Sequence, residues 1–211
     1  MRYTSLFIGS AFLCISMNSL ATVGGGQHIE FLGYEAKDQK LYLLRHFEDG
    51  RGRLPQLYYY QFSKHLRYPK LTQVNSLYVN KRTGLIDYDQ QYKVLEPELN
   101  KIRRRLQPIQ RITPKIFKII INKQQQRTVP AIWVDPNIKV QQYHYQYQVA
   151  SVWFGSQLQQ AVSYKPELKV KQAFYIPQQN KVVLTTQYLA FPEETGYLNE
   201  DPVLLEVKTR R

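Results

Sequence analysis

Short apolar runs rich in β-branched and aromatic residues recur along most of the chain, separated by polar turn residues. This pattern predicts β-strands. The first two strands, 28–34 and 41–44, flank the polar turn 37–40 and predict a β-hairpin. Further strands are expected at 57–62, 71–79, 116–122, 131–134, 139–154, 161–164, 169–175, 181–188 and 203–208. The chain is therefore predicted to be mainly β.

One segment has a helical period instead. Four apolar residues recur at intervals of four, three and four positions: Leu95, Leu99, Ile102 and Leu106. This spacing places them on one face of a helix. Pro97 suits the first turn, and Pro108 marks the end. We predict an antiparallel β-sandwich or open barrel with this single amphipathic helix on one face.

Two segments of the chain resemble each other. Residues 34–43 resemble residues 175–184 when aligned without a gap, and each segment precedes an acidic loop with glycine and then another apolar strand. A three-strand unit is thus expected near each end of the chain. The alternatives are an internal duplication and an ordinary likeness between hairpins, because two units are too few for a solenoid or a propeller.

The N-terminal segment has the features of an export signal. Arg2 precedes an apolar run at 6–15 that is too short to span a bilayer, and Ser19-Leu20-Ala21 resembles a cleavage site. We predict a signal peptide at 1–21 cleaved after Ala21, a flexible leader at 22–27 and a single domain at 28–211. The alternative is a retained membrane anchor. No later segment predicts a transmembrane helix, and the expected location is the bacterial periplasm or the cell exterior.

Composition narrows the possible functions. Of its 211 residues, 43% are hydrophobic and 13% are aromatic. A disordered chain contains fewer such residues, so disorder is excluded for most of the length. Its formal net charge is +13, or +12 once Arg2 is removed with the signal peptide. That segment also holds the only cysteine, Cys14, so the processed chain has no thiolate for catalysis or metal binding. Catalytic elbows, HExxH pairs and phosphate-binding glycine loops are missing from the sequence, which favours a non-enzymatic binding or envelope-maintenance protein without a cofactor. The alternative is an envelope glycan hydrolase that uses paired carboxylates.

The positive charge suggests an anionic partner. The candidate anion-binding residues cluster near the end of the predicted helix: Lys101, Arg103, Arg104 and Arg105. Guanidinium groups suit phosphate and carboxylate, so the expected partner is an anionic envelope component or an envelope protein. Export argues against nucleic acid. The alternative is a solvated basic surface, and the oligomeric state is left open.

Two further groups of residues are weaker candidates. Acidic loops could hold Ca²⁺ through Glu48, Asp49, Glu193 and Glu194, with Glu200 or Asp201 nearby. A glycan hydrolase would need two carboxylates from Asp49, Glu193, Glu194 or Asp201. An aromatic stripe on one face of a strand could stack sugar rings through Tyr143, Tyr145, Tyr147 and Trp153. The alternatives are solvated acidic turns, a half-buried sheet face, and a protein-interaction module that uses a sheet edge.

Several short motifs carry a resemblance to known proteins. Phe31-Leu32-Gly33-Tyr34, the turn 37–40, the strand 41–44 and the loop Asp49-Gly50-x-Gly52-x-x-Pro55 resemble a bacterial family of predicted secreted, periplasmic proteins of unknown function. The hairpin also resembles a blade fragment of a TolB-type propeller. These resemblances imply export and a β-rich fold, and they imply no activity and no catalytic residues.

Overall fold

The computed structural model describes residues 25–62, 69–192 and 196–208. The predicted signal peptide at 1–21 lies outside these residues. The described residues form one α-helix, α1 (Tyr92–Arg103), and three short 3-10 turns, η1 (Ser76–Tyr78), η2 (Pro114–Ile116) and η3 (Pro177–Gln179). The strands are β1 (Gln27–Glu35), β2 (Lys40–Phe47), β3 (Gln56–Gln61), β4 (Leu71–Gln73), β5 (Gln110–Ile112), β6 (Lys118–Ala131), β7 (Asp135–Ala150), β8 (Phe154–Ser156), β9 (Gln159–Ser163), β10 (Lys169–Ile176), β11 (Lys181–Phe191) and β12 (Tyr197–Val207).

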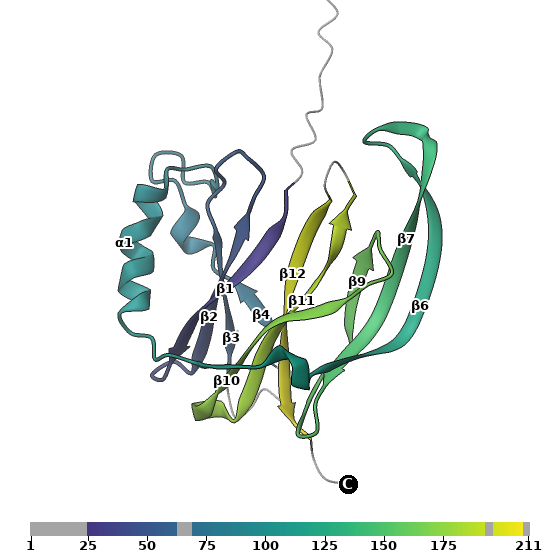
Figure 1. Cartoon of the computed structure of the whole chain (residues 1–211). Helices are drawn as coiled ribbons and strands as arrows, with labels where there is room; N and C mark the ends of the chain where they lie inside the picture. The colour runs from purple at the N-terminus through teal and green to yellow at the C-terminus, as the bar shows by residue number, and fades with distance from the viewer. Residues whose placement is uncertain (1–24, 63–68, 193–195, 209–211) are drawn as a thin grey trace, which may run out of the picture.

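The strands join in one large sheet. Its main path runs β4-β3-β2-β1-β12-β11-β10-β5, and β6 to β9 branch from it through β8 (Figure 1). All pairs are antiparallel except β1 and β12, which run parallel and pair Gln27 with Asn199. The sheet is therefore mixed, and it is not closed into a barrel. The predicted mainly β fold with one helix is confirmed.

Both predicted three-strand units are present. Strands β1, β2 and β3 form a first meander, and β10, β11 and β12 form a second meander with the same order and directions across the sheet. The matching residues Gln39 and Asn180 both have left-handed backbone angles, with φ of 52° and 49°, just before the second strand of each unit begins. The sequence likeness therefore corresponds to the same turn geometry.

Three apolar clusters pack the helix, the two meanders and strands β7 and β9 against one another. The first lies between the first meander and α1 and contains Tyr42, Leu44, Leu54, Leu57, Tyr78, Leu95, Leu99 and Ile102. The second joins the two meanders through Ile29, Tyr34, Leu41, Leu43, Tyr60, Phe62, Ile176 and Val183. The third packs the second meander against β7, β9 and Phe117 through Tyr145, Tyr147, Val149, Ala161, Ala173, Val182, Leu184, Val203 and Leu205. Burial of these side chains drives the association of the layers.

The helix differs from the prediction at both ends: Leu106, which was expected on its apolar face, lies beyond the last helical residue, Arg103. The helix begins at Tyr92, so Pro97 lies in the second turn and no acidic residue lies in the first turn. The proline has no N–H to donate to the carbonyl of Lys93, an exposed residue where water can bind instead. The predicted buried face is confirmed by Leu95, Leu99 and Ile102. Packing of this face against the first meander stabilises the helix despite the internal proline.

Several strand boundaries also differ. The expected strand 71–79 ends at Gln73 and is followed by η1, and the expected strand 131–134 is the turn of a hairpin. That hairpin, β6 with β7, has strands of 14 and 16 residues and extends away from the meanders as an arm (Figure 1). Its glutamine-rich run 124–126 lacks an apolar period, so no strand is predicted there from the sequence. The ladder with β7 makes it a strand. No helix in the described part of the chain is long and apolar enough to cross a membrane.

Candidate functional site

A polar cleft of about 360 Å³ lies between three parts of the molecule. The first meander and the segment after it contribute Arg45, Tyr60, Pro69, Lys70 and Leu71. The segment from β7 to β9 contributes Tyr147, Gln157, Gln159 and Gln160, and β12 contributes Asp201, Pro202, Leu204 and Glu206. Its volume is in the range of small-molecule sites. These residues are distant in the sequence and meet only because β1 and β12 lie side by side.

A hydrogen-bonded frame gives the cleft its shape. Arg45 Nη2 lies 3.0 Å from Asp201 Oδ1, and Arg45 Nη1 donates to Gln27 Oε1 at 2.8 Å. The Tyr188 hydroxyl donates to the other oxygen, Asp201 Oδ2, at 2.6 Å. Charge-assisted bonds of this kind are stronger than neutral ones. The frame therefore links the two meanders at the cleft.

Tyrosine hydroxyls complete this frame. Burial and the Asp201 charge raise the pKa of Tyr188. Burial also raises the pKa of Tyr147 to about 12, although its hydrogen bond with Thr186 opposes this effect. The hydroxyls of Tyr147 and Thr186 are 2.7 Å apart, and the Tyr60 hydroxyl donates to the Pro202 carbonyl at 3.1 Å. The hydroxyls of Tyr147 and Tyr188 therefore remain protonated well above neutral pH.

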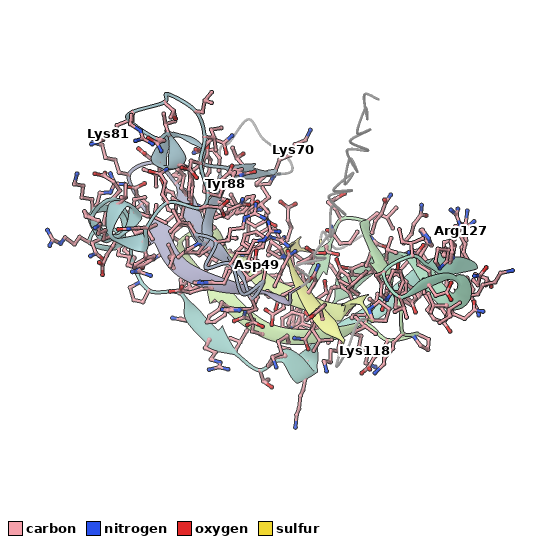
Figure 2. The ribbon with its side chains drawn as sticks, turned by 90° about the horizontal axis from the view of Figure 1, so that it is seen from above. Asp49, Lys70, Lys81, Tyr88, Lys118 and Arg127 are labelled. Carbon is pink, nitrogen blue, oxygen red and sulfur yellow. The ribbon has the colours of Figure 1, made fainter. Side chains whose placement is uncertain are left out.

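Three side chains in the cleft remain available to a ligand. Lys70, Gln157 and Gln160 are exposed and have no side-chain hydrogen bond or ion pair within the described part of the chain. In Figure 2, Lys70 extends away from the ribbon. An ammonium group and two amides can bind a carboxylate or phosphate together with hydroxyl groups.

The predicted anion-binding residues near the helix end are largely engaged in ion pairs. Lys101 Nζ lies 2.7 Å from Glu98, Arg103 lies 3.5 Å from Glu30, and Arg105 Nε lies 3.1 Å from Glu35 Oε1. Arg104 is exposed and has no ion pair among the described residues. The four side chains therefore do not converge on one open site. Two of them instead connect the helix end to β1.

The acids on β1 explain this connection. The side chain of Glu35 is 4% exposed, and it accepts a hydrogen bond from the Tyr42 hydroxyl at 3.3 Å as well as pairing with Arg105. Burial, together with the Glu35 charge, raises the pKa of Tyr42 to about 12. At Glu30, a hydrogen bond from His46 is the largest cause that lowers the carboxyl pKa, and it outweighs partial burial. These carboxylates thus have structural partners.

The predicted acidic candidates are not assembled into a site within the described structure. Glu48 Oε1 lies 3.0 Å from His28 Nδ1, and Asp49 Oδ1 accepts the backbone N–H of Arg51 at 3.1 Å. Figure 2 labels Asp49, and it does not line the cleft. Glu193 and Glu194 lie outside the described residues. Among the residues that the structure describes, no three His, Cys, Asp or Glu side chains are grouped so that they could hold a metal.

Two carboxylates do line the cleft, but their positions are unsuitable for glycoside hydrolysis. Asp201 and Glu206 lie five residues apart on β12, so their Cα atoms are roughly 16 Å apart at about 3.3 Å per residue. Catalytic carboxyl pairs lie about 5 to 10 Å apart. Asp201 also pairs with Arg45, and Glu206 lies 2.7 Å from Lys181 Nζ. The cleft therefore supports binding better than acid–base chemistry.

The four candidate aromatic residues do not form one surface. Tyr145 and Tyr147 are 4% and 1% exposed and belong to the third apolar cluster. Tyr143 is partly buried and stacks near Tyr145, with ring centroids 6.5 Å apart. Trp153 lies between β7 and β8 and is 62% exposed. Only Tyr147 reaches the cleft, where it is part of the wall.

Sequence reasoning missed most of the cleft. Arg45, Lys70 and the glutamines at 157, 159 and 160 belong to no motif. Their one signal is the density of glutamine at 157–160, from the end of β8 into β9, and it predicts no particular ligand. The functional argument depends on the geometry of the cleft, because no protein-family model, no curated protein and no solved structure matches this chain.

Proposed function

We propose that this chain is a non-enzymatic binding protein of the bacterial envelope, and that its cleft binds an acidic glycan. The observation that carries the proposal is the meeting of Lys70, Gln157 and Gln160 at one cleft with their polar groups unengaged in the described structure. The export signal expected at 1–21 supports an envelope location. The net charge, +13 for the full chain and +12 without residues 1–21, favours an anionic partner there.

The chemistry of the cleft supports this ligand class. A glycan offers many hydroxyl groups, which pair with amides that both donate and accept hydrogen bonds. A carboxylate or phosphate on the glycan would pair with Lys70, whose ammonium group has no acidic partner among the described residues. The frame of Arg45, Asp201 and Tyr188 holds the walls in place, so little ordering is needed on binding.

Equilibrium titration tests the proposal. Protein expressed from the full chain is titrated with soluble peptidoglycan fragments, which carry carboxylates, and with neutral maltooligosaccharides. We expect saturable binding of the acidic fragments and at least tenfold weaker binding of the neutral sugar. Lys70→Gln should weaken acidic glycan binding by about tenfold, as expected for loss of a charged hydrogen bond.

A matched variant separates site binding from general charge. Lys93→Gln removes the same charge from the exposed face of α1, outside the cleft, and should leave the affinity unchanged. Equal weakening by the two lysine variants, or no saturable binding at all, would contradict the proposal. Release of new reducing ends that is lost in Asp201→Asn would contradict its non-enzymatic part.

A further inference from the structure

An apolar groove of about 380 Å³ lies at one end of the molecule, away from the tip of the β6–β7 arm. Its walls come from β5, η2, the loop between β7 and β8, and the second meander. Most of the lining is aliphatic or aromatic: Ile112, Ile116, Phe117, Val152, Trp153 and Phe154. In Figure 1 this is the lower end of the molecule, where β12 ends. The polar cleft is a separate feature and shares no lining residue with this groove.

Large apolar side chains project beside the groove. Val152 is 77% exposed, Trp153 is 62% exposed and Ile116 is 54% exposed. They come from two separate turns, η2 and the loop 151–153. Single exposed apolar residues are common, but a cluster of them at an apolar groove indicates a surface that is covered by something else.

The charges around this surface are positive. Lys115 lies within η2, and Lys118 follows the buried Phe117. Lys208 forms two hydrogen bonds with the exposed loop 151–153. Its backbone N–H donates to the Trp153 carbonyl at 2.8 Å, and its Nζ donates to the Ser151 carbonyl at 2.6 Å. All three lysines are exposed, and none forms an ion pair within the described residues.

Acidic residues are scarce in the sequence segment that supplies most of the groove. Residues 99–166 contain eleven basic residues and one acidic residue, Asp135, which lies at the distal tip of the β6–β7 arm. Glu206 is close to this end on β12, and its carboxylate is paired with Lys181. The apolar surface is therefore bordered by cations without a compensating carboxylate in the described structure.

We propose that this end of the molecule docks on the surface of an anionic lipid bilayer, with Val152, Trp153 and Ile116 at the interface and Lys115, Lys118 and Lys208 near the headgroup phosphates. Tryptophan favours the membrane–water interface, and basic residues near an anionic leaflet are attracted to it. An acidic protein partner would satisfy the same charges, but the exposed residues project from two turns instead of following one strand or helix. Projecting apolar turns suit a soft, flat surface. Such shallow contact is reversible and sensitive to salt.

Vesicle binding tests the proposal. Protein expressed from the full chain is first checked by intact mass for loss of residues 1–21, because a retained signal segment would itself bind lipid. It is then mixed with vesicles of phosphatidylcholine alone or with 30% phosphatidylglycerol. We expect at least tenfold tighter binding to the anionic vesicles, and loss of most of this binding in 0.5 M NaCl.

Fluorescence locates the contact. The chain has two tryptophans. Besides Trp153 there is Trp133, which packs against Phe191 with ring centroids 4.7 Å apart. In Trp133→Phe, the remaining Trp153 should shift its emission to shorter wavelength on anionic vesicles, and brominated lipid should quench it. An unchanged spectrum with bound vesicles would contradict the proposal.

Variants separate the proposed surface from general adsorption. Val152→Ser with Trp153→Ser should reduce vesicle binding at least tenfold, whereas Leu85→Ser, at a residue that is 69% exposed elsewhere, should not. Lys70→Gln should leave vesicle binding unchanged, so failure here and failure of the glycan proposal are distinguishable. Equal binding by all variants would overturn the proposal. A concentration-dependent dimer that is lost in Val152→Ser with Trp153→Ser would overturn it in favour of self-association.

Discussion

Gly33 shows how one residue permits the contact between the first meander and the chain after α1. It lies at a register shift in β1, with φ of 141°. Next to it, the backbones of Tyr34 and Gln107 exchange two hydrogen bonds of 2.9 and 2.8 Å. A Cβ atom on Gly33 would lie 2.7 Å from the Gln107 carbonyl oxygen. Only glycine satisfies both the backbone angle and this close approach.

Gly33→Ala should therefore destabilise the protein by about 3 kcal/mol, through backbone strain and the forced displacement of residues 106 and 107. Gly50→Ala is the matched control, because Gly50 also has a positive φ of 69° but has no atom within 4 Å of the added Cβ. It should lose about 1 kcal/mol. Urea denaturation measures both changes. Equal losses would show that the close approach to Gln107 has little effect.

Glu30 provides a pH-dependent contribution at the residue scale. Its pKa is lowered from the ordinary value of 4.5, mainly by the hydrogen bond with His46. A lowered pKa in the folded state means that the ionised carboxylate stabilises the fold above pH 4.5. This contribution is lost as the pH falls through the folded-state value. Because 42% of the side chain is exposed, solvent screening keeps the effect small.

Glu30→Gln should thus lower the free energy of unfolding by less than about 1 kcal/mol at pH 5.5, and the difference from the unmodified protein should shrink as the pH is lowered from 4.5 towards 3. Urea denaturation at the two pH values measures it. A difference that grows towards pH 3 would contradict the assigned sign.

At the scale of single elements, the helix illustrates what periodicity can establish. The spacing of Leu95, Leu99 and Ile102 identified the buried face, and the structure confirms it. The predicted start of the helix was wrong. Proline is most favourable in the first turn of a helix, so Pro97 was expected in that turn, but the helix begins earlier, at Tyr92. Contact with the first meander offsets the missing hydrogen bond at Pro97. Helix propensity read from neighbouring residues cannot predict this tertiary contact.

Leu99→Ala should destabilise the protein by about 3 kcal/mol, because Leu99 is fully buried in the cluster between α1 and the first meander. Val94→Ala is the control on the same helix. Val94 is 49% exposed, so the free energy of unfolding should change by less than about 0.5 kcal/mol. Thermal denaturation followed by circular dichroism measures both. A Leu99→Ala variant as stable as Val94→Ala would show that the helix is dispensable for the fold.

The long strand β6 shows how an exposed element can be protected. Within the described structure it pairs only with β7, so its other edge is free. Lys118, Lys123, Arg127 and Pro130 are spaced along it, and charged residues and proline discourage pairing with another chain. Figure 2 shows Arg127 on the arm, well separated from Lys118. This arrangement supports the cleft, more than the sheet edge, as the binding site.

At the scale of the whole molecule, the parallel contact between β1 and β12 positions the walls of the proposed binding cleft. It places two meanders side by side, and it brings Arg45 to Asp201 across 156 residues of sequence. It also leaves the projecting turns around Trp153 at the end where β12 stops. Cleavage after Ala21 and the envelope location stay predictions at this scale, and the intact mass of the exported protein checks the first of them.

Patterns within short segments were sufficient to predict the β-rich class, the single helix, the first hairpin and the two three-strand units. These features depend on the local period of apolar residues and on turn chemistry, which a sequence displays directly. Tertiary structure alone decided which candidate side chains remain available to a ligand. It paired Arg103 and Arg105 with acids of β1, buried Tyr145 and Tyr147, and assembled the cleft from unremarkable residues. The reason is physical: ion pairing and burial depend on distances between segments far apart in the chain, and those distances are set by how the layers pack.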